Sequence, residues 1–155
     1  MRIESIRQSL FATGAKDCHV DRVMRAWAQG KPLDAGPRNH PPEAFLPLAL
    51  RNALPGLHDE LSALARVRSE HPGEDGSSRL LVELGDGQTV ESVLLPRDGL
   101  CISTQIGCAV GCTFCMTGRD GLLRQVSSGE MLAQVILGRA RRKVARVVFM
   151  GMGEP

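Results

Sequence analysis

The chain has 155 residues, 43% of them hydrophobic and 23% charged, with a formal net charge of +2. This composition is typical of a globular protein and excludes a disordered or fibrous chain, while the small net charge indicates no class of partner. No apolar run approaches the roughly 18 residues of a membrane span, and charges interrupt the N-terminus MRIESIRQSLFATG, where a signal peptide needs an apolar stretch. We therefore expect a cytoplasmic protein without a membrane-spanning segment.

Residues 1–65 are predicted to form a small helical domain. Helices are expected over IESIRQSLFA, before Thr13-Gly14, and over VDRVMRAWAQ, before Gly30, because glycine often follows the last residue of a helix. The Pro- and Gly-rich sequence GKPLDAGPRNHPP is expected to be a loop. Two further apolar stretches, FLPLALRNAL and LHDELSALAR, flank Pro55-Gly56, which predicts two helices separated at that point.

Residues 66–97 are predicted to contain a linker and a β-hairpin. The linker is the polar stretch SEHPGEDGSS. After it, residues 79–84 and 89–95 have the composition of short strands and flank Gly85-Asp86-Gly87, which is typical of a hairpin loop. These two segments are therefore expected to pair.

Residues 98–155 are predicted to follow the order strand, loop, helix, strand. LCIST is the first strand, a cysteine-rich loop follows, SSGEMLAQVILGRARRK contains the helix and VVFM is the second strand. Ser127 and Glu130 have the spacing of a capping box at the start of that helix. Ligands bind at the carboxyl ends of parallel strands, so the cysteine loop and the sequence GMGEP are expected to face one pocket of an α/β fold.

Three of the five cysteines, Cys108, Cys112 and Cys115, lie within CAVGCTFC at the spacing C-x3-C-x2-C. A structural zinc ion needs a fourth ligand, and the histidine nearest to the three cysteines is His71, far upstream. Three closely spaced thiolates suit a cubane iron–sulfur cluster whose fourth iron stays open to a small molecule. The alternative, that the cysteines are merely small buried residues, is disfavoured by this spacing among glycines.

The sequences CISTQIGCAVGCTFCMTG and FMGMGEP resemble those of radical S-adenosylmethionine (SAM) enzymes, and in particular the RlmN/Cfr group of RNA adenosine methyltransferases. The resemblance extends upstream through ESVLLP and, more weakly, to VDRVMRAWAQ. It implies that residues 1–65 are an accessory domain that engages RNA. Residues 98–155 would begin a partial barrel of the TIM type, incomplete in this chain.

The resemblance implies how the cofactors are bound. Cys108, Cys112 and Cys115 would hold a [4Fe-4S] cluster, whose open iron takes the amino and carboxylate groups of SAM. Gly153 and Glu154 match the GEP motif that receives the methionine amino group, a role that suits a carboxylate at a strand end. Taken without the cysteines, GMGEP is equally compatible with an ordinary turn between a strand and a helix.

Two residues are implied to act in catalysis. Cys101 matches a resolving cysteine that helps to release the methylated RNA from a covalent link to the protein, and Glu91 matches the proton acceptor. Without the resemblance, Cys101 would be interpreted as a buried strand cysteine. Glu91, on the face opposite to Val90, would be interpreted as a solvated hairpin residue.

RNA binding is implied by the resemblance, with rRNA, tRNA or both as substrate. The run RARRK places Arg139, Arg142 and Lys143 near one face of the predicted helix. These side chains either contact phosphates or form the solvated side of the helix, and the second interpretation is favoured.

The function implied is methylation of an adenine carbon, with C2 favoured, through a methyl-cysteine intermediate. In complete relatives the methyl-carrying cysteine lies near the C-terminus, beyond the segment matched here, so we expect an N-terminal fragment that does not turn over alone. An electron donor such as flavodoxin is expected, and a monomer is favoured. Two alternatives stay open: a radical SAM enzyme acting on a non-RNA substrate, and a non-catalytic metal-binding fragment.

Overall fold

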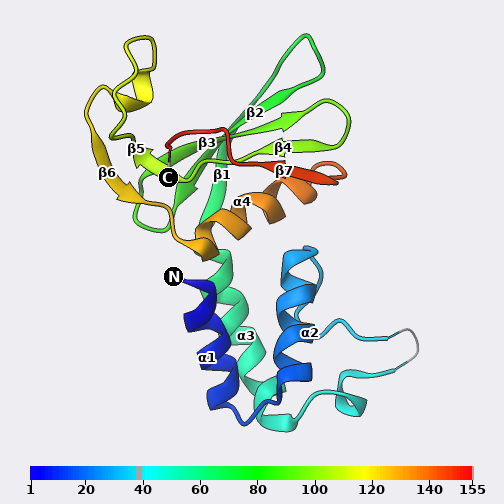
Figure 1. Cartoon of the computed structure of the whole chain (residues 1–155). Helices are drawn as coiled ribbons and strands as arrows, with labels where there is room; N and C mark the ends of the chain where they lie inside the picture. The colour runs from blue at the N-terminus through cyan, green and yellow to red at the C-terminus, as the bar shows by residue number, and fades with distance from the viewer. Residues whose placement is uncertain (38–39, 155) are drawn as a thin grey trace.

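The computed structural model describes residues 1–37 and 40–154. Helices form one end of the molecule, a mixed β-sheet forms the other, and helix α4 lies between them (Figure 1). The N-terminal helices are α1 (Ile3–Ala12), α2 (Asp17–Ala28) and α3 (Leu48–Ser62), with a short 3-10 helix, η1 (Pro42–Ala44), before α3. None of the helices in the described part of the chain is long and apolar enough to cross a membrane.

The predicted ends of the first two helices are confirmed, because α1 and α2 stop before Gly14 and Gly30. Both glycines have positive φ angles. A residue in this conformation ends a helix, and glycine adopts it without steric strain because it has no Cβ atom. Residues 38 and 39 of the predicted loop GKPLDAGPRNHPP lie outside the described residues.

The predicted break at Pro55-Gly56 is wrong, because α3 continues through both residues. The buried face of α3 consists of leucines at helical spacing: Leu50, Leu54, Leu57 and Leu61. A proline inside a helix costs about 3 kcal/mol through a lost hydrogen bond and a clash. Burying each leucine contributes about 2 kcal/mol, so the continuous apolar face outweighs that cost.

The sheet has the strand order β1-β2-β3-β4-β7. β1 (Ala65–Pro72), β2 (Ser78–Leu84) and β3 (Thr89–Leu95) pair antiparallel, which confirms the predicted hairpin of residues 79–84 and 89–95. The predicted linker is wrong in part, because its first residues form the end of β1. β1 is an edge strand that exposes most of its side chains, so its polar sequence is compatible with a strand.

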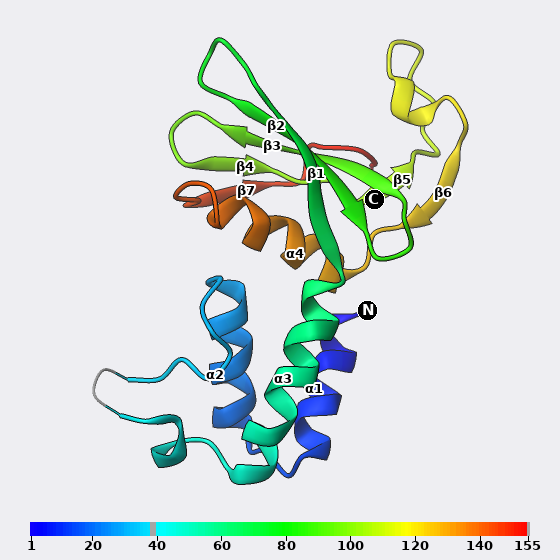
Figure 2. The same ribbon diagram turned by 180° about the vertical axis from the view of Figure 1, so that it is seen from behind.

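β4 (Gly99–Cys101), α4 (Ser128–Arg139) and β7 (Arg146–Val148) form the predicted strand–helix–strand unit (Figure 2). β7 pairs in parallel with β4, whereas β4 pairs antiparallel with β3. The described chain is therefore a mixed α/β structure, in which N-terminal helices precede a five-stranded mixed sheet.

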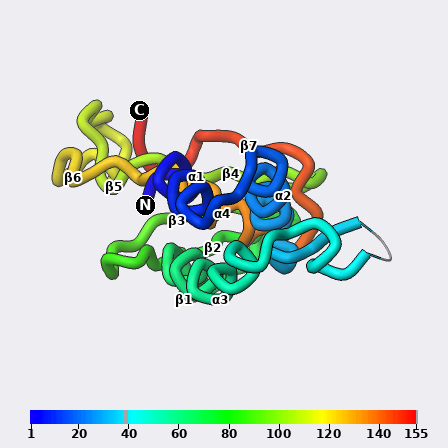
Figure 3. The backbone as a smooth tube through the Cα atoms, turned by 90° about the horizontal axis from the view of Figure 1, so that it is seen from below, coloured from blue at the N-terminus to red at the C-terminus, as the bar shows by residue number. Residues whose placement is uncertain are grey.

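The predicted loop between β4 and α4 contains a hairpin of its own. β5 (Gln105–Gly107) and β6 (Leu122–Gln125) pair antiparallel as a separate two-stranded sheet. The cysteine sequence and a 3-10 helix, η2 (Met116–Gly118), lie between them. Seen from the helical end, this hairpin lies at one side of the molecule and α2 at the other (Figure 3). Strands of three and four residues are too short to show an alternating pattern, so the sequence does not reveal this hairpin.

Helix α4 packs against both the sheet and the N-terminal helices. A Cβ atom added to Gly138 would lie 2.9 Å from Leu100 Cδ2, so the missing side chain lets α4 approach β4 closely. On its other side, Arg139 donates a hydrogen bond to the Ala28 carbonyl at the end of α2. One hydrophobic core therefore contains residues of the N-terminal helices, α4 and the sheet.

The start of α4 is fixed by the predicted capping box, which is confirmed. The Ser127 N–H donates to Glu130 Oε2 (2.7 Å), and the Glu130 N–H donates to Ser127 Oγ (3.4 Å). Arg124 of β6 adds two contacts to Glu130, Nη2 to Oε1 (2.9 Å) and Nη1 to Oε2 (3.0 Å). Burial by itself would raise the pKa of Glu130, but the hydrogen bonds from Arg124 and Ser127 hold it below the ordinary value.

Acid is therefore expected to destabilise the fold by protonating Glu130. Because the folded pKa lies below the unfolded value of roughly 4.3, this contribution is complete above that pH and is lost as the pH falls through the folded pKa. Urea midpoints measured between about pH 6 and about pH 3 should fall more steeply for the unsubstituted chain than for Glu130→Gln. Parallel pH dependences of the two proteins would contradict the prediction.

Candidate functional site

The segment after β7 is held along the continuation of β4. The Gly151 N–H donates to the Ile102 carbonyl (3.1 Å), and the Thr104 N–H donates to the Met152 carbonyl (2.9 Å). The sequence GMGEP therefore lies at the carboxyl ends of the two parallel strands, as predicted, and its last described residues lie beside β5 (Figures 1 and 2). Pro155, the last residue of the motif, lies outside the described residues.

The Ser103 hydroxyl connects two of the predicted site segments. It donates to the Glu91 carbonyl oxygen (2.6 Å) and accepts from the Met152 N–H (2.8 Å). Ser103 is fully buried, and its own N–H and carbonyl both bind the side-chain amide of Gln134 in α4, each at 3.0 Å. The main chain at Glu91 and the GMGEP segment are thereby fixed relative to each other.

The Glu91 side chain lies on the solvent side of β3. Val90 beside it is completely buried, whereas the Glu91 side chain is 43% exposed and pairs with Arg79 of β2 (Nη1 to Oε1, 3.3 Å). The expected placement on the face opposite to Val90 is thus confirmed. The carboxylate is accessible to a molecule from solvent, which a proton acceptor for a large substrate requires.

Cys101 is the last residue of β4 and is buried between its neighbours Val93 on β3 and Val148 on β7. This burial raises the pKa of the Cys101 thiol, although a hydrogen bond from the Met150 main chain opposes the shift. The thiol is therefore protonated at neutral pH. Its contact with Met150 places Cys101 directly against the segment that leads to Gly153.

Cys108, Cys112 and Cys115 lie on one loop between β5 and β6, as free thiols. Cys108 is buried, and its N–H donates to the Gly121 carbonyl (3.1 Å) at the far end of the loop, whereas the other two cysteines are exposed. Within residues 1–37 and 40–154, no three side chains of His, Cys, Asp or Glu are placed so as to hold a metal ion. The structure thus brings the cysteines to one loop without gathering their sulfur atoms.

The cysteine sulfur atoms on this loop are the type of ligand that an iron–sulfur cluster requires. A hydrogen bond from the Thr117 hydroxyl lowers the pKa of the Cys115 thiol, helped by the N–H groups of Thr117 and Gly118, and so favours the thiolate that binds iron. Gly111 has a φ of +63° between the first two cysteines, and no atom of the described chain beyond its two neighbours in sequence lies within 4 Å of the place of its missing Cβ. Sulfur donors on an open loop suit iron rather than magnesium or calcium.

The basic run RARRK begins at Arg139, the last residue of α4, so the prediction that Arg142 and Lys143 share a helix face with Arg139 is wrong. The run is engaged within the chain. Arg139 donates to a carbonyl of α2, and Arg142 Nη1 donates to the Gly76 carbonyl in the turn between β1 and β2 (2.8 Å). Lys143 Nζ pairs with Asp98 Oδ2 (2.9 Å). These contacts attach the end of α4 to its neighbours, so they favour a structural role over a contact with phosphate.

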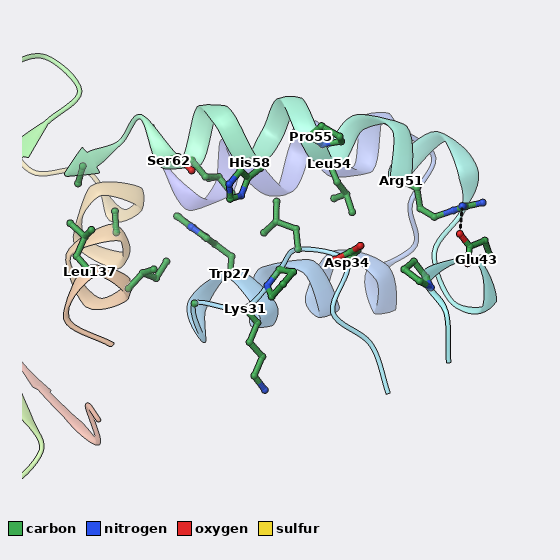
Figure 4. Close-up of a pocket in the computed structure, with 18 residues that line it drawn as sticks. Trp27, Lys31, Asp34, Glu43, Arg51, Leu54, Pro55, His58, Ser62 and Leu137 are labelled. Atoms are coloured by element: carbon green, nitrogen blue, oxygen red, sulfur yellow. Dashed lines mark hydrogen bonds and ion pairs between the residues drawn. The ribbon is translucent and has the colours of Figure 1, made fainter. Parts of the chain in front are cut away.

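A hollow of about 830 Å³ lies between α2, α3 and α4 (Figure 4). Apolar side chains such as Trp27, Leu54 and Leu137 line much of it, and Arg51 pairs with Glu43 at one end (3.0 Å). None of the residues predicted to be catalytic, cofactor-binding or cluster-binding lines this hollow. It is therefore separate from the site at the strand ends.

Sequence reasoning missed three buried polar residues that shape the site: Ser103, Gln105 and Gln134. The first two lie within CISTQIGC and the third within the apolar run MLAQVIL. A polar residue inside an apolar run was the one available signal, since a buried polar group needs a partner. The partners themselves come from other parts of the chain and carry no local motif.

The chain is similar along its whole length to several curated proteins. It is 84% identical over 155 residues to a protein of Dechloromonas aromatica, 68% to one of Thiobacillus denitrificans and 66% to one of Leptothrix cholodnii. All three are described as probable RNA methyltransferases, and the chain spans 43%, 42% and 44% of their respective lengths. No protein-family model matches the chain.

A solved structure supports the same relationship. The crystal structure of a radical SAM methyltransferase from Sphaerobacter thermophilus superposes with a TM-score of 0.67 at 32% identity, covering 100% of this chain and 46% of that one. Over its whole length the chain is therefore similar, in sequence and in fold, to these methyltransferases, and it spans less than half the length of each of them.

Proposed function

We propose that the chain is the SAM-binding part of an enzyme that methylates an adenine carbon, with C2 favoured, in rRNA, tRNA or both. The observation that carries the proposal is the position of Gly153 and Glu154 at the ends of two parallel strands, next to the segment that Cys101 contacts. The 84% identity to a probable RNA methyltransferase supports the reaction class. The methyl-carrying cysteine is proposed to lie in the part of the relatives that the chain does not span.

The cofactor roles follow from the chemistry of the side chains. Glu154 is exposed, and its carboxylate would bind the ammonium group of the methionine part of SAM. Cys108, Cys112 and Cys115 would hold a [4Fe-4S] cluster, which when bound supplies the electron that cleaves SAM. A small redox protein such as flavodoxin would reduce it.

Glu91 and Cys101 are proposed to act on the RNA. The Glu91 carboxylate would accept a proton from the adenine, and Arg79 orients it from the neighbouring strand. Cys101 would take part in releasing the methylated RNA from its covalent link to the protein. Burial raises the pKa of the Cys101 thiol, so the thiol is protonated and weakly nucleophilic in this structure.

The N-terminal helices offer a surface for the RNA backbone, which supports residues 1–65 as an RNA-engaging domain. A groove of about 510 Å³ along α2 is lined by Arg22, Arg25 and Lys31. The guanidinium of Arg22 stacks over the Phe45 ring at 4.8 Å, and none of the three cations forms an ion pair with a described carboxylate. Unpaired cations in a groove are the usual contacts of phosphate groups.

The proposed function is tested in a chimera. The matching part of the Dechloromonas aromatica relative is replaced by this chain, reconstituted anaerobically with iron and sulfide, and supplied with SAM, a reductant and unmodified RNA. Mass spectrometry of nucleoside digests should detect methylated adenosine. Glu91→Gln and Cys101→Ala should each lower the yield by about 100-fold or more, whereas Arg68→Gln, on the exposed side of β1, should not.

Two outcomes of this chimera assay would refute the proposal. One is a chimera that methylates no adenosine while the unaltered relative does so under the same conditions. The other is SAM cleavage by the chimera without any modification of RNA, which would favour an enzyme that acts on a different substrate. The 155-residue chain alone is expected to give no multiple turnover.

A further inference from the structure

Gln105, the first residue of β5, has its side chain directed at the main chain of Glu154. Gln105 Nε2 donates to the Glu154 carbonyl oxygen (3.2 Å), and the Glu154 N–H donates to Gln105 Oε1 (3.1 Å). The amide group thus binds both polar groups of a single residue, in the way that a neighbouring strand would. Gln105 is only 3% exposed, so water does not compete for these two bonds.

Gly153 makes this contact possible. It has a φ of +98°, and a Cβ atom added to it would lie 2.4 Å from Gln105 Cβ and 2.7 Å from Gln105 Cγ. The glycine main chain therefore lies directly on the stem of the Gln105 side chain, where any other residue would collide. The fit of Gly153 onto Gln105 explains why a glycine precedes the glutamate in this segment.

The main chain of Gln105 is fixed independently of Glu154. Its N–H donates to the Met152 carbonyl (3.1 Å), and β5 pairs with β6 so that Gln105 lies opposite Gln125. Gln105 therefore attaches an irregular segment of chain to a hairpin. Without it, the Glu154 main chain would have no hydrogen-bond partner among the described residues and would follow the motion of an exposed segment.

We propose that Gln105 is the positioning residue for Glu154. By holding both the N–H and the carbonyl of Glu154, it fixes the point from which the carboxylate extends, and so sets where the ammonium group of the ligand binds. The proposal rests on the proposed function for the role of Glu154 toward SAM. The attachment of the Glu154 main chain to Gln105 stands on the geometry alone.

Two substitutions separate this role from simple packing. Gln105→Met keeps nearly the same volume and removes both hydrogen bonds. Gln105→Glu keeps an oxygen that accepts from the Glu154 N–H, but it introduces a buried charge. If Gln105 acted only by filling space, Met would be the milder change, because burying a carboxylate is costly. Gln125→Met, at the exposed position opposite on β6, is the matched control.

The first measurement is amide hydrogen exchange of the 155-residue chain, resolved by residue with NMR. Gln105→Met should accelerate exchange at the Glu154 amide by about tenfold, corresponding to the loss of one hydrogen bond. Gln105→Glu should leave this rate close to that of the unsubstituted chain. Exchange at the Thr104 amide, which bonds to Met152, should not change in either variant. Equal rates at Glu154 in all three proteins would overturn the proposal.

The second measurement is the affinity of the cluster-loaded chain for SAM, by calorimetry. Gln105→Met should weaken binding by about tenfold, and Gln125→Met should not. Faster exchange at Glu154 with unchanged affinity would overturn the positioning role. If the unsubstituted chain bound no SAM, the proposed function would be refuted, and the exchange rates would still decide whether Gln105 holds the Glu154 main chain.

Discussion

Replacing Cys108, Cys112 or Cys115 by alanine is expected to abolish iron–sulfur binding by the chain. Each thiolate is one of three protein ligands of the proposed cluster, so the loss of any one leaves too few to retain it. Anaerobic reconstitution should give about four iron and four sulfide per unsubstituted chain, and close to none for each variant. Iron and sulfide analysis together with visible absorbance measures the effect.

Cys18→Ala is the control for this prediction. Cys18 is an exposed free thiol on α2, far along the chain from the loop, and its removal should leave iron content unchanged. Far-UV circular dichroism of all four variants should match the unsubstituted chain, because two of the three loop cysteines are exposed. Retention of iron by the loop variants would contradict the prediction, and a colourless protein that binds one zinc ion would favour the metal-binding alternative.

The spacing of these cysteines could be recognised in the sequence, but the arrangement of their sulfur atoms could not. Spacing fixes how far apart ligands are along the chain, whereas their position in space depends on the loop conformation. Cys112 and Cys115 are exposed, and Phe114 between them is 91% exposed, so little packing holds this loop in one form. A metal centre whose ligands lie on such a loop gains its geometry when the metal binds.

The parts of the fold that depend on local signals were predicted correctly. The capping box of Ser127 and Glu130, the hairpin around Gly85-Asp86-Gly87 and the helix ends before glycine each need only a few neighbouring residues. The errors arose where tertiary contacts override local preference. α3 continues through Pro55 because the leucines before and after the proline are buried on one face of the helix. The polar end of β1 is a strand because β2 provides its hydrogen-bonding partner.

The predicted site residues were assigned from the resemblance, and the structure supplies contacts that connect Glu91, Cys101 and the GMGEP segment. Cys101 and the GMGEP segment come together because β4 and β7 are adjacent and parallel. The link to Glu91 passes through the Ser103 hydroxyl. No sequence pattern predicts this role of Ser103. Its partner Met152 is 49 residues away along the chain, so the hydrogen bond between them exists only in the folded chain.

Replacing Gln134 by leucine is expected to destabilise the fold by about 4 kcal/mol. Gln134 is completely buried, and its Oε1 accepts from the Ser92 hydroxyl (2.9 Å) and from the Ser103 N–H (3.0 Å). Its Nε2 donates to the Ser103 carbonyl (3.0 Å). Leucine is of similar size but leaves three buried polar groups without these bonds, each at a cost of about 1–3 kcal/mol. Urea unfolding measures the change in unfolding free energy from the shift of the midpoint, with the m-value expected to stay the same.

Two further variants give this prediction its controls. Gln125→Leu, at an exposed position, should change the unfolding free energy by less than about 0.5 kcal/mol. Adding Ser92→Ala to Gln134→Leu should restore about 1 kcal/mol, because it removes one of the unpaired groups. A Gln134→Leu protein as stable as the unsubstituted chain would show that Ser103 finds other partners. In that case α4 would not be what fixes Ser103, and the connection between Glu91 and the GMGEP segment would rest on the sheet alone.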